Sequence, residues 1–140
     1  MKKEPSLPRP TDTELSILRI LWEHGPARVR TVAEELSRER GEEVGYTTAL
    51  KFLQLMREKG LVDRDESERS HRYTSRHQPA QVRRKVLGSL ADKLFGGATA
   101  QLALHALSDG AATPDELRQI RALLDELESE TPNQKGSPES

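Results

Sequence analysis

The order of helical and strand-like segments along residues 11–77 is the feature that most constrains what this chain can fold into. Apolar residues recur at helical spacing in three short segments, which we expect to form helices over about 12–24, 31–39 and 46–60. Alternating apolar and polar residues on both sides of a polar turn then predict a two-stranded hairpin over 61–74. Three helices in tight succession followed by a hairpin make a winged helix-turn-helix.

Local signals support the starts of these elements. Thr11 and Glu14 fit a capping box, in which each side chain accepts a hydrogen bond from the other residue's backbone amide. Thr31 and Glu34 fit a second box and predict the start of the second helix. The short segment 27–29 before that helix is a candidate for a minimal strand.

A second region begins at Gln78-Pro79 and is expected to form three more helices. Apolar residues at helical spacing predict one helix that ends at Gly96-Gly97, another over about 99–108 and a third over about 114–128. Helices of this length that carry leucines and few aromatics cannot easily bury themselves alone, which favours a dimer interface. The residues expected there are Val86, Leu90, Leu94, Leu117, Ile120, Leu124 and Leu127.

The composition fits small domains with thin cores. Only 34% of the 140 residues are hydrophobic and 32% are charged, which leaves little material for a large enclosed cavity. We expect a mainly α fold with a small β-hairpin, made of a winged helix-turn-helix domain and a C-terminal helical dimerisation domain. The expected boundaries are 1–10 for a flexible lead, 11–77 and 78–128 for the two domains, and 129–140 for a disordered tail.

Several kinds of site have no support in the sequence. The chain contains no cysteine, and its four histidines lack metal-ligand spacing, so we expect no disulfide and no metal site. No grouping of residues indicates a catalytic triad, so we expect neither an enzyme nor a cofactor. No apolar segment approaches the roughly 20 residues of a membrane span, and we expect a cytoplasmic protein without membrane insertion. The net charge of −1 neither favours nor excludes a nucleic-acid partner.

The segment 46–60 has the pattern of a DNA-recognition helix. Its apolar residues fall on one face. Its opposite face begins with Thr47, Thr48 and Lys51, whose hydroxyl and ammonium groups can contact bases or phosphates. Tyr46 either packs onto the core or donates to a phosphate.

Further candidate DNA contacts lie outside this helix. Arg72 and Arg69 belong to the expected hairpin, which would be the wing of the fold. Arg28 and Arg30 precede or open the second helix, whose N-terminus is suited to a phosphate. Residues 44–76 hold seven Lys/Arg against five Asp/Glu, a net charge of only +2, and Glu66 and Glu68 weaken the case for the wing. The plain alternative for each arginine is a solvated charge.

Three segments together resemble the penicillinase-repressor (BlaI/MecI) family. These are the Thr-Asp-Thr-Glu-Leu-Ser-Ile-Leu-Arg-Ile-Leu-Trp run at 11–22, the Tyr-Thr-Thr start of segment 46–60 and the Glu-Lys-Gly-Leu-Val run at 58–62. The resemblance extends over about residues 7–128 and includes both expected domains. Leu55 departs from it, because many members carry a basic residue at that position.

The resemblance implies a homodimeric transcriptional repressor that binds dyad-symmetric operator DNA through its winged helices and dimerises through its C-terminal helices. It also implies a link to a membrane sensor protease, or to a protease downstream of it, whose cleavage of the C-terminal region relieves repression. Copper-sensing relatives carry cysteines near the C-terminus, and this chain has none.

Two other functions are compatible with the residues. The first is a winged-helix module that binds another protein and no DNA, which the near-neutral charge favours. Salt-dependent binding to duplex DNA separates this module from a repressor. The second is a repressor controlled by a small ligand, which calorimetry against metabolites would detect. The shortage of aromatic residues, 4% of the chain, argues against the ligand.

Overall fold

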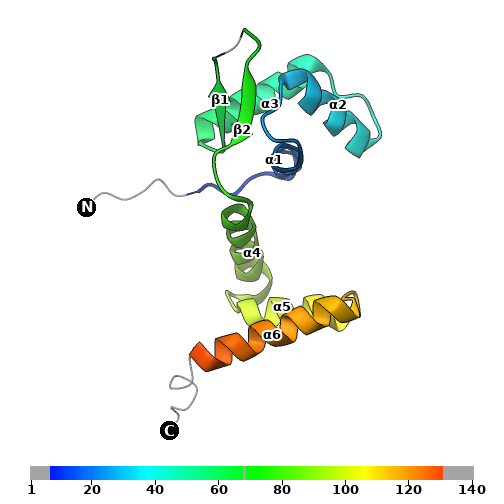
Figure 1. Cartoon of the computed structure of the whole chain (residues 1–140), viewed down its shortest axis with the longest axis vertical. Coiled ribbons are helices and arrows are strands. Elements are labelled where there is room, and N and C mark those ends of the chain that lie inside the picture. Colours follow the sequence, from blue (N-terminus) through cyan, green and yellow to red (C-terminus); the bar gives the residue numbers. More distant parts are fainter. Residues whose placement is uncertain (1–6, 68, 131–140) are drawn as a thin grey trace, which may run out of the picture. The chain divides into compact units, whose positions relative to one another are not determined.

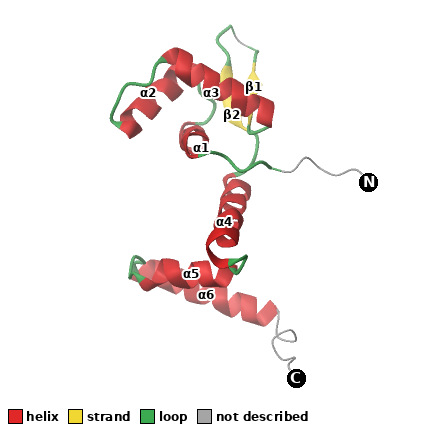
Figure 2. Cartoon of the chain, turned by 180° about the vertical axis from the view of Figure 1, so that it is seen from behind, coloured by secondary structure: helices red, strands yellow, loops and turns green. Residues whose placement is uncertain are grey.

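The computed structural model describes residues 7–67 and 69–130 (Figure 1). Helices dominate the described chain, and one antiparallel hairpin supplies its named strands (Figure 2). Contacts divide the chain into two compact units, a first unit of residues 1–97 and a second unit of residues 98–140. No helix in the described part of the chain is both long enough and apolar enough to cross a membrane.

The first unit contains the predicted winged helix-turn-helix. Its elements in chain order are α1 (Asp12–His24), α2 (Val29–Arg40), α3 (Tyr46–Lys59), β1 (Val62–Asp65), β2 (Arg72–Ser75) and α4 (Pro79–Phe95). The strands pair antiparallel with Val62 opposite Ser75 and Asp65 opposite Arg72. The prediction of a mainly α fold with a small hairpin is confirmed.

The capping box predicted for α1 is present. The Thr11 amide donates to Glu14 Oε1 at 3.0 Å, and the Glu14 amide donates to Thr11 Oγ1 at 3.2 Å. Gly60 follows α3 in a left-handed conformation with φ of 86° and ends that helix as expected. The ends of α1 and α3 therefore follow from signals within a few residues of each end.

The second predicted capping box is wrong. Arg28 is the N-cap of α2, so Thr31 lies inside the first turn of this helix. The cause is a pairing distant in sequence: the Ala27 amide donates to the Tyr73 carbonyl at 3.0 Å, and the Tyr73 amide donates to the Ala27 carbonyl at 2.8 Å. This isolated bridge confirms the pairing expected for segment 27–29 at Ala27 alone, because Val29 already belongs to α2. It ends the extended segment earlier than the sequence suggests, and the helix begins directly afterwards.

The core of the first unit lies among α1, α2, α3 and the hairpin, and α4 contributes to it. Val82 is fully buried in this core, and Val86 packs against it while partly buried. The Arg83 guanidinium lies 5.5 Å from the centre of the Trp22 ring, within range of a cation–π contact. The chain accordingly divides after residue 97, and not at 77/78 where the sequence pattern changes.

Part of the expected flexible lead is also attached to the first unit. Leu7 packs against the core, Pro10 is buried, and Arg9 Nη1 donates to Ser89 Oγ at 2.9 Å. These contacts differ from the expectation for 1–10, of which residues 1–6 lie outside the described range. Most of the expected tail, residues 131–140, lies outside it as well.

The second unit consists of α5 (Thr99–Ser108) and α6 (Pro114–Glu130) in its described part. A capping box precedes α6, in which the Thr113 amide donates to Glu116 Oε1 at 2.9 Å and the Glu116 amide donates to Thr113 Oγ1 at 3.1 Å. Helix α6 runs beyond its predicted end at 128. Neither α5 nor α6 contains a buried residue in the single chain, so their apolar side chains lack a core.

Candidate nucleic-acid interface

A groove of about 610 Å³ opens on the first unit between the start of α2, the start of α3 and the wing, which is the hairpin β1–β2 with its turn at 66–71. Its basic lining residues are Arg28, Arg30, Arg64, Arg69 and His71. No carboxylate among the described residues lines it. The groove therefore has the charge and the concave shape that suit a polyanion.

Four of the residues proposed from the sequence meet in this groove. Arg28 and Arg30 come from the start of α2, Tyr46 from the start of α3, and Arg69 from the wing. The Tyr46 side chain is not a core staple, because the residue is 55% exposed. Three separate segments thus place predicted contact residues along one concave surface.

The N-termini of α2 and α3 reinforce this charge. Unlike α1, neither helix has a side-chain cap hydrogen bond among the described residues. Their first backbone amides have no intrahelical acceptor, and the helix dipole places partial positive charge there. Both ends can therefore receive an anionic oxygen.

The remaining predicted residues of α3 lie beside the groove and do not line it. Thr47, Thr48 and Lys51 are exposed, while Ala49 and Leu53 are buried on the opposite face. On a helix, Thr47 and Lys51 fall next to the stripe of residues 46, 50 and 54 that lines the groove. The polar side of α3 and the groove thus form one continuous exposed surface.

Arg72 lies apart from the groove. It pairs with Asp65 across the hairpin, whereas the groove residues Arg64 and Tyr73 pair with each other. Adjacent residues of a strand point to opposite faces, so Arg72 lies on the other face of the wing. The hydrogen bond from the Ser67 amide lowers the pKa of Asp65, and the positive charge of Arg72 lowers it further.

Gln54 and Arg64 are among the groove residues that were not predicted from the sequence. Gln54 lies on α3 two turns after Tyr46, and Arg64 lies on β1 with its side chain half-buried. A signal for Arg64 was present, because a period of two from the buried Val62 places Arg64 on the face turned towards the helices. Because the segment carries charges of both signs, its sequence did not identify Arg64 as a groove residue.

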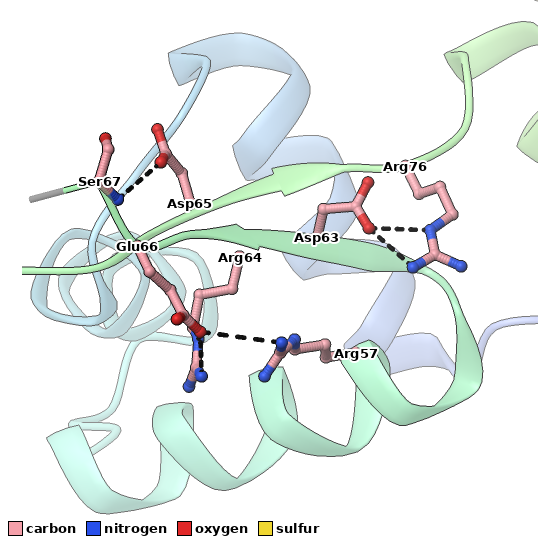
Figure 3. Close-up of polar contacts among 7 residues, drawn as sticks. All are labelled: Arg57, Asp63, Arg64, Asp65, Glu66, Ser67 and Arg76. Carbon is pink, nitrogen blue, oxygen red and sulfur yellow. Dashed lines mark hydrogen bonds and ion pairs between the residues drawn. The ribbon is translucent and has the colours of Figure 1, made fainter.

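Arg64 is held by an acidic residue of the wing turn (Figure 3). Arg64 Nε donates to Glu66 Oε2 at 2.7 Å, and the same carboxylate oxygen lies 3.8 Å from Arg57 Nη2 on α3. The hydrogen bond from Arg64 lowers the pKa of Glu66, and the hydrogen bond to Glu66 raises the pKa of Arg64. Arg57 and Arg64 also line a second cavity of about 560 Å³ together with Gln54 and Glu58.

The expected dimerisation residues lie on both units and differ in exposure. Val86 packs against the core of the first unit, and Ile120 is half-buried. The exposed ones are Leu90, Leu94, Leu117, Leu124 and Leu127. Leu87, Leu104 and Leu123, which were not proposed, are exposed as well.

Comparison with known proteins adds four findings. A family model described as penicillinase repressor matches residues 10–126. The chain is 32% identical over 125 residues to the transcriptional regulator BlaI of Mycobacterium tuberculosis, covering 88% of each protein. A structure of RosR from H. salinarum aligns with a TM-score of 0.50 and 20% identity, over 89% of this chain and 98% of that one, which is a likeness of fold. The monomeric form of Bacillus licheniformis BlaI with the blaP half-operator aligns with a TM-score of 0.47 and 22% identity, over 54% and 90%.

Proposed function

This chain is a member of the penicillinase-repressor family, and from that premise we propose that it is a homodimeric repressor of transcription that binds dyad-symmetric operator DNA. The observation that carries the proposal is the groove, where four arginines and a histidine from the start of α2 and from the wing adjoin the polar side of α3. Occupation of the operator would exclude RNA polymerase. The protein would act in the cytoplasm.

In the proposed complex α3 enters the major groove. Thr47, Thr48 and Lys51 contact base edges or nearby phosphates, because hydroxyl and ammonium groups can donate to base acceptors and a threonine methyl can touch a thymine methyl. Arg28 and Arg30 contact the phosphate backbone together with the N-terminus of α2. The phosphate contacts fix the register, and the α3 contacts read the sequence.

The first experiment identifies the operator and measures its salt dependence. The full-length protein selects sequences from a random duplex library, and fluorescence anisotropy then gives its affinity for the selected duplex at several KCl concentrations. We expect log K to fall steeply with log [KCl], by about 0.9 for each phosphate neutralised. Absence of selection, with no salt-dependent binding to any duplex, would refute the proposal and favour a protein-interaction module.

The exposed apolar residues of the second unit support a dimer. Among residues 98–130 none is buried in a single chain, and leucines along α6 are exposed. Apolar faces of this kind are normally covered by a partner, and a second copy satisfies them by two-fold symmetry. Such a dimer would present two winged helices to the two halves of an operator.

We also infer that cleavage in the C-terminal region relieves repression, through a membrane sensor protease or a protease downstream of it. Gly96 and Gly97 join the two units with φ values of 59° and 94°, and both are exposed. A cut there would separate the DNA-binding unit from the second unit. The binding of two half-sites would then lose its linkage, which contributes roughly 10²–10⁴-fold to affinity.

An inserted protease site tests this control. A recognition sequence for a site-specific protease is placed between Gly96 and Gly97, and operator binding is compared before and after cleavage. We expect the uncut variant to bind like wild type and the cut protein to lose tight binding. Undiminished binding after complete cleavage would refute control by cutting at this joint.

A further inference from the structure

The carboxylate of Glu66 contacts two arginines that face the proposed DNA surface. Arg64 Nε donates to it at 2.7 Å, and Arg57 Nη2 lies 3.8 Å from the same oxygen (Figure 3). Arg64 lines the groove, and both arginines line the adjacent cavity beside α3. Glu66 therefore supplies negative charge directly to two arginines of this surface.

Stability is a weak reason for this arrangement. The side chains of Glu66 and Arg57 are 47% and 45% exposed, and exposed ion pairs contribute little to folding because water screens them. The hairpin has its own ladder and its bridge to Ala27, and Tyr73 is buried beneath it. None of these contacts between the wing and the core involves Glu66.

The carboxylate has a larger effect on the attraction of phosphates. Non-specific binding to DNA derives almost entirely from cations that neutralise phosphates and release counterions. Long arginine side chains can reach phosphates in many registers of the duplex. While Glu66 holds Arg64 and Arg57, a phosphate must displace the carboxylate before either guanidinium can contribute.

We propose that Glu66 is a specificity-determining residue that restrains non-specific DNA binding by holding Arg64 and Arg57. Operator binding also uses contacts of α3 with base edges, in one fixed register, and these do not require the two arginines to be released. Glu66 thus lowers affinity for arbitrary DNA more than affinity for the operator. The inference rests on the proposed function, since it concerns the same surface.

The test uses full-length wild type and Glu66→Gln on a random-sequence 30-base-pair duplex, by anisotropy over a KCl series. The variant keeps the side-chain shape and removes the charge. We expect it to bind this duplex several-fold more tightly, with a salt slope steeper by about 0.9 for each arginine released. Its affinity for the selected operator should rise less, so that the ratio of specific to non-specific affinity falls.

Glu58→Gln is the matched control. It also removes one negative charge, from a residue that lines the cavity of Arg57 and Arg64, but Glu58 shows no ion pair among the described residues. We expect this control to leave the slope near that of wild type. An equal gain in both variants would overturn the inference, because net charge alone would then explain it.

A triple variant, Glu66→Gln with Arg57→Gln and Arg64→Gln, tests whether Glu66 acts through the two arginines. The gain of Glu66→Gln should disappear in this background, and persistence of the gain would overturn the inference. The inference would also be overturned if Glu66→Gln kept the wild-type salt slope but had a lower unfolding midpoint. That result would show that Glu66 stabilises the fold and does not restrain DNA binding. If neither wild type nor any variant binds duplex DNA, both the proposed function and this inference are refuted. If wild type binds and Glu66→Gln shows the same salt slope, only this inference is refuted.

Discussion

At the scale of single residues, Glu14 connects the start of α1 to the end of the proposed recognition helix. Its side chain is 4% exposed, and its two oxygens accept from Lys59 Nζ at 2.9 and 2.8 Å. One of these oxygens also accepts from the Thr11 amide at 3.0 Å. A single buried carboxylate therefore caps one helix and fixes the far end of another.

Replacement of Lys59 should leave the buried Glu14 carboxylate without its cationic partner and so destabilise the fold. We expect Lys59→Met to lower the free energy of unfolding by about 1–3 kcal/mol, since Glu14 would stay buried with fewer partners. The loss remains below that of a fully buried pair, because the Lys59 side chain is 40% exposed. Chemical denaturation followed by circular dichroism measures it. Lys51→Met removes an exposed lysine from the same helix and should change little; equal losses would contradict this role of Glu14.

The polar side of α3 gives the residue-scale prediction for function. Thr48→Ala and Lys51→Ala should each weaken operator binding by about 1–3 kcal/mol, because each removes a contact of the kind that reads or anchors DNA. Both residues are exposed, so the free energy of unfolding should not change. Anisotropy titrations at one salt concentration measure the effect. Wild-type affinity in both variants would move the recognition surface away from this side of α3.

At the scale of elements, the turn from α3 into β1 depends on Gly60. Its φ of +86° lies in the left-handed region, and a Cβ there would meet Arg76 Nη1 at 3.2 Å. Arg76 is itself engaged, with Nε and Nη2 at 2.9 and 2.7 Å from Asp63 Oδ1 (Figure 3). This turn sets how the wing leaves the recognition helix.

Alanine at two glycines should have effects of opposite sign. Gly60→Ala should lower the free energy of unfolding by about 1–2 kcal/mol, because alanine is strained at positive φ. Gly88→Ala lies within α4, where a Cβ meets nothing within 4 Å, and should raise it by about 0.5–1 kcal/mol. Thermal and urea unfolding of the pair measure both shifts. A neutral Gly60→Ala would show that the turn adapts without strain.

Helix α4 is the element whose membership in the first unit has the clearest consequence. A chain ending at residue 97 should fold, whereas one ending at residue 77 should lose about 2–4 kcal/mol of stability. The shorter chain lacks the buried Val82 and the contact of Arg83 with Trp22. Urea unfolding of the two truncated chains and the full chain measures the difference. Equal stability of the two truncated chains would contradict a structural role for α4.

At the scale of the whole molecule, the proposed role of the second unit is dimerisation, which requires a second copy of the chain. It contains no buried residue in its described part, although its helices carry leucines along their length. A winged helix alone offers few contacts to DNA, so the second copy would supply the second half-site at an effective concentration of order mM. Repression would then depend on the second unit, although the proposed DNA contacts all lie on the first.

A charge in the apolar stripe of α6 tests that dependence. Leu124 is 52% exposed in the single chain, and Leu124→Asp should dissociate the proposed dimer because an unpaired charge would be buried there. The fold of the first unit should persist, and operator affinity should fall by roughly 10²–10⁴-fold as linkage is lost. Sedimentation and anisotropy measure the two effects. A variant that stays dimeric at micromolar concentration would place the interface on other residues.

Features that depend on neighbours along the chain could be predicted from the sequence. The capping box at Thr11 involves groups three residues apart, so local spacing was enough to predict it. The capping box at Thr113 and the left-handed Gly60 depend on equally local groups. Helical periodicity and the hairpin alternation were enough for the winged fold and for the polar side of α3.

The tertiary structure decided what depends on residues far apart. The start of α2 follows from the pairing of Ala27 with Tyr73, and the attachment of α4 follows from the burial of Val82 among distant helices. The groove likewise needed three segments to meet, which placed Arg64 in it and left Arg72 on the other face. Periodicity shows which residues share a face of one element, but only packing between elements shows what that face meets.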